Sequence, residues 1–469
     1  MKPSTRVLAV ASAMVLVAGT TGVLLLTRGR SPAASGGRPN IVLILTDDQR
    51  WDTLWAMPEV RRLLVADGAT FSNAFVVNPL CCPSRSSILS GDYSHTTGVY
   101  SNGGPHGGFS AFHDRSTIAT WLHDAGFDTG LVGKYLNQYP GGYVPPGWDT
   151  WNAMVMNPDA GGFYYDWSLS RGRQVIHFGD RPEDYSTNVL ASRAVRFIRS
   201  ADGPLFLYFA PWAPHGDPVP APGDGDAFAG LKPFRPPSYD EADMSDKPEY
   251  IRSAPAFGRQ KTRIVDAYRR GQYQALLAVD RAVGGIVDAL RDTGRLDDTM
   301  IVFASDNGLA WGEHRWDSKQ VPYEESIRVP LVIRYPPLTS EAATVPQMAL
   351  NIDLAPTFAA LAGVPAPYVD GRSLLPLLRG TATRWRRDFL IEHVRTDRRL
   401  PVPTYCAVRT THQLFAVYVT GESEYYDLRT DPYELQNRAE DPHTLSARQA
   451  LARRLHDLCN PPPPHMPRP

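Results

Sequence analysis

The chain has 469 residues, of which 43% are hydrophobic and 21% are charged, a composition typical of a globular protein with a large core. The formal net charge is −1 and no basic stripe or tail occurs, so the sequence gives no sign of a nucleic-acid partner. Charges that select a substrate must therefore belong to a local site.

The first 38 residues differ in composition from the rest of the chain. An apolar run over residues 7–26 lies between Lys2 and Arg6 on one side and Arg28 on the other, ahead of a Ser-, Ala-, Gly- and Pro-rich linker. Such a run is typical of an export signal or a signal anchor, and its length is close to that of a membrane span. We therefore expect an exported protein, either extracellular or tethered to a membrane and facing outside. The chain has no Asn-x-Ser/Thr acceptor for N-glycans, which favours a bacterial type of exported protein.

A series of predicted strands and helices follows the linker. Residues 39–46 form an unbroken apolar run with β-branched side chains, which predicts a strand buried on both faces. Strands alternating with helices predict an α/β fold with a mostly parallel sheet. Further strands are predicted at 129–134, 205–210, 299–304 and 329–334, and helices at 116–125 and 263–290.

A long segment over residues 211–255 is rich in Pro, Gly and Asp and has no clear period. Segments of this kind are binding loops or insertions without regular structure. Its aromatic side chains could offer a surface to a sugar ring, or they could only pin the loop to the sheet, and both alternatives stay open. These side chains are Trp212, Phe228, Phe234 and Tyr239.

The pattern changes near residue 379, where short strand-like pieces alternate with turns before a helix over 446–458. This predicts a small C-terminal α+β domain with an antiparallel sheet. We expect a catalytic domain over 39–380, the α+β domain over 381–460 and a loose Pro-rich tail over 461–469. Cys406 and Cys459 both fall in this C-terminal part, and because exported proteins keep disulfides we expect them to pair.

The most informative segment is residues 80–91, Leu-Cys-Cys-Pro-Ser-Arg-Ser-Ser-Ile-Leu-Ser-Gly. Pro83 is suited to start a helix, which places Cys81 at the positive helix end, where backbone N–H groups attract an anion. Arg85 follows about one turn later and can direct a cation to the same place. The segment predicts an anion pocket with a sulfur side chain at its base. The alternative is a structural pair formed by Cys81 and Cys82.

Polar clusters follow the predicted strands and can meet at one edge of the sheet, where α/β proteins bind ligands. Asp47, Asp48, Asp306 and Asn307 offer only oxygen ligands, which favours Ca²⁺, with Mg²⁺ as the alternative. Two unrelated capped turns are the competing explanation. Side chains that could stabilise an anionic transition state are Arg85, Lys134, His215 and Lys319.

Residues 81–91 resemble the signature of the type I sulfatases, Cys-x-Pro-Ser-Arg with a short apolar step and a Gly. The resemblance extends over about 39–459 and implies an alkaline-phosphatase-like fold and a sulfuric-ester hydrolase. It implies a first metal-binding pair at Asp47 and Asp48 and a second at Asp306 and Asn307. Other family motifs contain Lys134, His215 and Lys319.

In that family a formylglycine-generating enzyme oxidises the signature cysteine, and the hydrated formylglycine attacks the sulfate ester. The resemblance therefore implies that Cys81 is modified and lies at the metal. It implies that Arg85, Lys134 and Lys319 hold the sulfate oxygens, and that His215 or Lys319 helps the alcohol to leave. The covalent sulfate is then expelled as the hydrate returns to the aldehyde.

Within the family, residues 133–137 resemble the N-acetylglucosamine-6-sulfatases and their bacterial relatives. This implies a sulfated carbohydrate substrate, of the kind found in glycosaminoglycans, and substrate contacts from Asn102, Asn137 and His314. The chain departs from many arylsulfatases, which carry a His where Leu136 or Asn137 stands here. The alternatives are a broad arylsulfatase acting on aryl sulfates, a phosphodiesterase or phosphonate monoester hydrolase, and a glycan-binding protein without turnover.

Overall fold

The computed structural model describes Met1 and residues 37–156, 162–395 and 401–469. The predicted export segment over residues 7–26 lies outside these residues. No helix in the described part of the chain is long and apolar enough to cross a membrane. All the described helices and strands belong to the unit Arg38–Pro469. The domain boundary near residue 380 stays a prediction.

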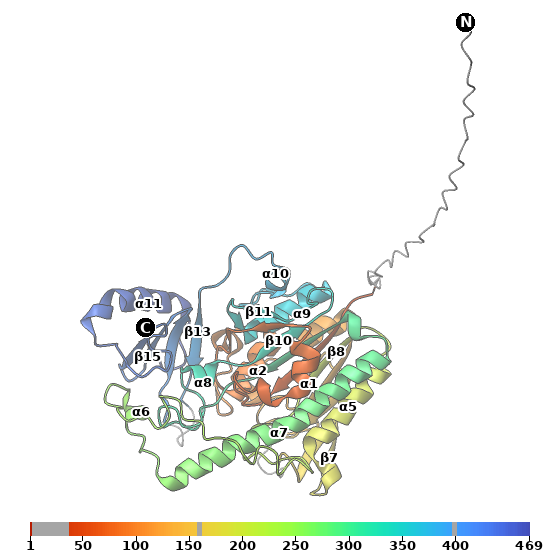
Figure 1. Ribbon diagram of the computed structural model, residues 1–469, viewed down its shortest axis with the longest axis horizontal. Helices are drawn as coiled ribbons and strands as arrows, with labels where there is room; N and C mark the ends of the chain where they lie inside the picture. The colour runs from red at the N-terminus through yellow and green to blue at the C-terminus, as the bar shows by residue number, and fades with distance from the viewer. Residues whose placement is uncertain (2–36, 157–161, 396–400) are drawn as a thin grey trace. The chain divides into compact units, whose positions relative to one another are not determined.

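A ten-stranded sheet runs through the larger part of this unit (Figure 1). Its five central strands are parallel, and antiparallel strands are added toward both edges. The predicted α/β fold with a mostly parallel sheet is therefore confirmed. In spatial order the strands are β11 (Ala343–Val345), β2 (Ala69–Phe71), β10 (Leu331–Arg334), β9 (Thr299–Ser305), β1 (Asn40–Thr46), β8 (Leu205–Ala210), β4 (Asp128–Gly133), β5 (Thr150–Met154), β6 (Trp167–Arg171) and β7 (Gln174–Phe178).

Helices pack on both faces of the sheet, because successive strand residues point in opposite directions. Phe206 of β8 contacts Phe358 on one face of the sheet. The next residue of β8, Leu207, points to the other face, and so does its partner in β4, Gly130. Gly130 faces Phe197 there. On the Phe358 side lie α2 (Cys81–Ser90), α4 (Ile118–Asp124) and α9 (Leu354–Ala362). On the Phe197 side the amphipathic helices α5 (Ser186–Ser200) and α7 (Arg259–Asp292) lie side by side (Figure 1), together with α1 (Pro58–Val60).

The register of the central strands fixes where the chemistry lies. Strand β1 is completely buried from Ile41 to Leu45, as its apolar sequence predicts. It pairs with β9 so that Thr46 lies opposite Ser305. The next residues along the two strands are Asp47 and Asp306, and the sheet therefore brings these carboxylates together.

The C-terminal part forms a four-stranded antiparallel sheet, as predicted, with a helix packed against it. A disulfide joins Cys406 in this sheet to Cys459 at the end of the helix. The tail over 461–469 is predicted to be loose, yet Met466 is 6% exposed and packs in one apolar cluster with Leu455. The elements are β13 (Asp388–His393), β14 (Tyr405–Thr410), β15 (Gln413–Tyr418), β16 (Ser423–Asp427) and α11 (Leu445–Leu458).

The remaining regular elements are short. A two-stranded sheet pairs β3 (Ala74–Phe75) with β12 (Ala349–Leu350). The short helices are α3 (Ser94–Thr97), α6 (Glu249–Arg252), α8 (Glu324–Ile327) and α10 (Leu375–Leu378). One turn of π-helix covers Arg61–Val65, and several single turns are of the 3-10 type.

Candidate active site

Helix α2 presents Cys81 at its first position and is buried along its whole length. The sequence predicts that Pro83 opens the helix, but the helix begins two residues earlier. The N–H groups of the first turn have no partner within a helix, so proline is tolerated at the third position as well. Gly91 ends the helix in the left-handed conformation, with φ of 86°.

Arg85 lies one turn after Cys81 and is fully buried. Its guanidinium forms hydrogen bonds at the ends of three strands. Its Nε donates to Asp306 Oδ2 at 2.7 Å, and a terminal nitrogen donates to Asp47 Oδ2 at 3.2 Å. The other terminal nitrogen donates to the carbonyl oxygen of Lys134 at 3.0 Å. The guanidinium therefore holds the ends of β1, β9 and β4 around the start of α2.

Two lysines complete the pairing of the carboxylates. Lys134 Nζ forms an ion pair with Asp47, and Lys319 Nζ forms one with Asp48. Lys319 Nζ also lies 2.8 Å from Cys81 Sγ. The site thus concentrates buried positive and negative charges around one sulfur atom, an arrangement that suits an anionic substrate group.

Gly133 is required where β4 delivers Lys134 to the site. Its φ is 124°, and a Cβ atom at this position would lie 2.0 Å from the carbonyl oxygen of Ala210 in β8. The backbone N–H of Lys134 donates to that same oxygen at 2.7 Å. Only glycine permits this close approach of the two strands.

His215 lies in the loop after β8 and faces the aspartate pair. Its Nε2 is 3.5 Å from Asp48 Oδ2 and 4.0 Å from Asp47 Oδ1. Trp212 packs beside it, with ring centroids 4.1 Å apart, and stacks on Phe163 at 4.0 Å. Burial lowers the pKa of His215 to about 4 against the opposing effect of the two aspartates.

The aromatic side chains of the 211–255 loop pack against the protein. Trp212 is 5% exposed, and the other three contact rings from other segments. This arrangement matches the alternative in which the aromatics pin the loop in place. The ring pairs are Phe228 with Trp55 and Tyr273, Phe234 with Trp311, and Tyr239 with Phe257.

Burial and neighbouring charges shift the titration of the central groups in different directions. Burial alone would raise the pKa of Asp47, but Lys134, His215 and Arg85 hold it below its ordinary value. Burial, with the charge of Asp47, raises the pKa of Asp306 to about 6 and that of the Cys81 thiol to about 12.

Asp47 and Asp48, two of the four oxygen ligands predicted from the sequence, belong to a possible metal-binding cluster, and Asp306 and Asn307 are hydrogen-bonded to Asp48 beside it. Ligand atoms of Asp47, Asp48, Cys81 and His215 lie within 4.8 Å of one another. Asn307 Nδ2 donates to Asp48 Oδ1 at 2.6 Å, and Asn307 Oδ1 is buried with no hydrogen-bond partner among the described residues. Three buried carboxylates with an orphaned amide oxygen fit a hard divalent cation.

The three predicted substrate contacts lie in different settings. Asn102 Oδ1 accepts a hydrogen bond from the N–H of Cys82 at 2.9 Å, so this side chain satisfies a donor at the start of α2. Asn137 Oδ1 is buried without a hydrogen-bond partner in the described part of the chain. His314 lies with Glu325 and Glu434 in a separate group.

A cleft of about 370 Å³ opens onto Asp48, His215 and Lys319. Sequence reasoning missed the residues that form its other walls, because they come from α7 and from loops distant in the chain. Ile264 and Tyr268 are four residues apart and so share one side of α7, but the sequence does not show that this side is exposed. The additional lining residues include Asp217, Ile264, Tyr268, Trp311 and Asp317.

Two family models match the chain and together cover most of its length. The sulfatase family model matches residues 39–364. The chain belongs to the sulfatase family. A second family model, the C-terminal region of N-sulphoglucosamine sulphohydrolase, matches residues 312–460. The predicted membership of a family of sulfuric-ester hydrolases is thereby confirmed.

Individual sulfatases resemble the chain over most of its length. An extracellular sulfatase SULF-1 homolog of Drosophila melanogaster is 38% identical over 77% of this chain, which spans 34% of that relative. Human N-acetylglucosamine-6-sulfatase is 33% identical, covering 88% of this chain and 83% of the human protein. A solved structure in complex with its substrate D-glucosamine-2-N,6-O-disulfate superposes with a TM-score of 0.80 at 25% identity, covering 90% of this chain and 98% of that one.

Proposed function

We propose that this sulfatase hydrolyses sulfate esters of carbohydrates outside the cell, with 6-sulfated N-acetylglucosamine as the preferred group. The observation that carries the proposal is the similarity to N-acetylglucosamine-6-sulfatase along most of both chains. The related structure bound to a 6-O-sulfated glucosamine supports the same substrate class. The relative named as an extracellular sulfatase supports export.

The nucleophile is assigned to Cys81 after its conversion to formylglycine by a formylglycine-generating enzyme. Formylglycine would supply a hydrated aldehyde whose hydroxyl can attack sulfur. Asp47, Asp48, Asp306 and Asn307 would hold Ca²⁺, with Mg²⁺ as the alternative ion. A divalent cation there supplies positive charge that polarises the sulfate group.

The side chains of the protein have separate roles in this proposal. Arg85, Lys134 and Lys319 hold the sulfate oxygens, because buried cations stabilise developing negative charge strongly. Lys319 or His215 donates the proton that the sugar oxygen needs when it leaves. The cleft beside His215 accommodates the sugar, with Tyr268 and Trp311 in its walls.

Activity on a substrate panel tests the proposal. The full chain, produced with the formylglycine-generating enzyme, is assayed on N-acetylglucosamine 6-sulfate, an aryl sulfate, an aryl phosphodiester and an aryl phosphonate. We expect sulfate release from the sugar and faster cleavage of the sulfates than of the phosphorus esters. Turnover of the aryl sulfate without release from any sulfated monosaccharide would contradict the carbohydrate assignment. Preference for a phosphorus ester would favour the phosphodiesterase or phosphonate alternative.

The choice between His215 and Lys319 as proton donor can be tested with two leaving groups. A sugar alkoxide leaves far less readily than a phenolate, so loss of the acid harms sugar-sulfate hydrolysis more. If His215 is the acid, His215→Ala lowers kcat on the sugar sulfate by a larger factor than on the aryl sulfate. Equal losses on both substrates would remove His215 as the acid.

A further inference from the structure

His314, Glu325 and Glu434 form a second cluster of ligand-type side chains, which the proposed mechanism does not use. Their ligand atoms lie within 4.8 Å of one another. The three side chains come from the loop after β9, from α8 and from the segment after β16. Each residue is more than nine-tenths buried.

Each of these side chains has one polar atom that no described residue pairs with. His314 Nε2, Glu325 Oε2 and Glu434 Oε1 are buried and have no hydrogen-bond partner among the described residues. Buried polar atoms are nearly always paired in folded proteins. Three such atoms from three segments, meeting at one place, indicate a missing common partner.

The remaining contacts orient the free atoms toward one another. His314 Nδ1 lies 2.6 Å from Glu241 Oε2, and Lys247 Nζ lies 3.3 Å from the other oxygen of Glu241. Glu434 Oε2 accepts a hydrogen bond from the N–H of Glu324 at 3.2 Å. A histidine that donates from Nδ1 to a carboxylate presents the lone pair of Nε2, as metal-binding histidines do.

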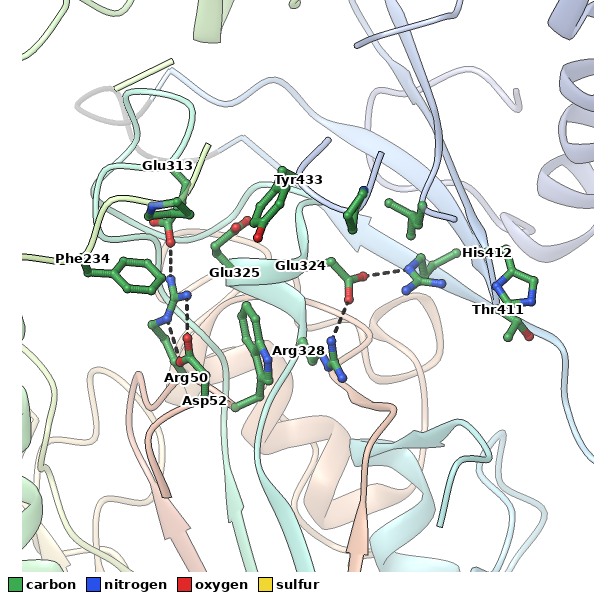
Figure 2. Close-up of a pocket in the computed structure, with 15 residues that line it drawn as sticks. Arg50, Asp52, Phe234, Glu313, Glu324, Glu325, Arg328, Thr411, His412 and Tyr433 are labelled. Carbon is green, nitrogen blue, oxygen red and sulfur yellow. Dashed lines mark hydrogen bonds and ion pairs between the residues drawn. The ribbon is translucent and has the colours of Figure 1, made fainter. Parts of the chain in front are cut away.

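The neighbouring cations are already engaged by other carboxylates, as Figure 2 shows. Arg50 pairs with Glu313 at 2.8 Å and with Asp52 at 3.0 Å. The guanidinium of Arg409 donates to Glu324 at 2.8 Å. Within the described part of the chain no ion pair is formed by Glu325 or Glu434. Their negative charge in this buried place is therefore unfavourable unless a positive ion or a proton joins them.

One member of the cluster, Glu325, borders a cavity of about 360 Å³ (Figure 2). Glu325 lies in its wall, together with Arg50, Glu313, Arg328 and Tyr433. The cavity therefore brings solvent up to one of the three side chains of the cluster.

We propose that His314, Glu325 and Glu434 bind a divalent transition-metal ion, with Zn²⁺ as the test ion, at a site separate from that of Cys81. One imidazole nitrogen and two carboxylate oxygens suit Zn²⁺ or Mn²⁺ better than Ca²⁺, which prefers oxygen alone. The ion joins the segment after β16 to the loop that carries both His314 and Lys319. Its role is to fix that loop, and through it the position of Lys319.

Metal content and anomalous diffraction test the proposal. The full chain is stripped with a chelator, dialysed against Ca²⁺ and a small excess of Zn²⁺, and compared with Glu434→Gln and with the control Glu440→Gln, whose side chain is exposed. We expect wild type and the control to retain one more Zn²⁺ per chain than Glu434→Gln. Zn²⁺ should raise the Tm of the first two proteins more than that of Glu434→Gln.

Crystals of the wild-type protein soaked in Zn²⁺ give a readout that needs no variant. We expect an anomalous peak within bonding distance of His314 Nε2, and any Zn²⁺ near Cys81 would appear as a different peak. Absence of a peak at His314, with equal zinc content in wild type and Glu434→Gln, would overturn the proposal. That result would leave a proton shared between Glu325 and Glu434 as the partner.

Discussion

Lys319 Nζ lies 2.8 Å from Cys81 Sγ, where the first turn of α2 meets the loop after β9. The same amine pairs with Asp48, one of the oxygen ligands predicted from the sequence. One cation therefore contacts both the proposed nucleophile position and the proposed metal site. A substitution at Cys81 therefore removes a contact of the same lysine that pairs with Asp48.

Conversion of Cys81, and not of Cys82, is the first prediction. Mass spectrometry of the peptide should show a loss of about 18 Da at Cys81, as expected for replacement of –CH₂SH by –CHO. Cys81→Ala should lower kcat by a factor on the order of 10⁴ or more, as loss of a nucleophile does. Cys82→Ala, at the unconstrained motif position, should retain most activity and lose about 1 kcal/mol of stability. An active preparation with both thiols intact would contradict the covalent mechanism.

Removal of the divalent cation should abolish activity reversibly. Chelation leaves Asp47, Asp48 and Asp306 without the ion, and added Ca²⁺ should restore turnover. Saturating Ca²⁺ at about 100 times Kd should add about 2.7 kcal/mol to the free energy of unfolding. Asp306→Asn should lose most of this stabilisation, whereas Asp457→Asn, at an exposed position, should keep it. Activity that survives chelation, or that returns with Zn²⁺ but with neither Ca²⁺ nor Mg²⁺, would count against this cation site.

The disulfide between Cys406 and Cys459 should contribute substantially to stability. Its two residues are 53 positions apart, and closing a loop of this length stabilises the folded state by about 4 kcal/mol in the chain-entropy model. Urea unfolding of Cys406→Ala/Cys459→Ala should show this loss relative to wild type. Thiol labelling of the denatured, unreduced protein is the control. Labelling at both positions would show that the bond does not form.

Stability should fall in acid because of His393 in β13. Burial lowers the pKa of this side chain from 6.5 to about 3. Between these pH values protons bind to the unfolded chain and not to the folded one, so folded-state stability decreases as pH falls, by up to about 1.4 kcal/mol per unit. Urea unfolding across pH 3 to 6.5 should give a shallower slope for His393→Gln than for wild type. His443→Gln, at an exposed position, should match wild type; equal slopes for all three proteins would refute the assignment.

The centre of the fold could be predicted because its signals are local. The apolar run of β1 and the acidic residues that follow it are adjacent in sequence, and sheet register then places Asp47 beside Asp306. Strand β7 had no such signal, since its side chains are mostly exposed and do not alternate between buried and exposed. Helix α5 lies between recognised elements and was not predicted, although its strongly amphipathic pattern was available in the sequence.

Contacts between segments far apart in the chain could not be predicted from local sequence patterns. The role of Asn102 at the start of α2 depends on a loop about twenty residues away, and its sequence pattern indicated only a polar side chain near the site. Glu434 reaches α8 across 110 positions. Nothing in its neighbourhood distinguishes it from the other acidic residues of the C-terminal part.

Loss of activity in variants of Gly133 has a different cause from loss of activity in variants of a catalytic residue. Gly133 contributes no functional group, yet any side chain there collides with β8 and displaces the strand that delivers Lys134. In a saturation-mutagenesis screen scored by sulfate release, position 133 will therefore look the same as a catalytic position. A parallel measurement of protein abundance separates the two cases, because replacements of Gly133 deplete folded enzyme whereas Cys81→Ala lowers activity far more than it lowers abundance.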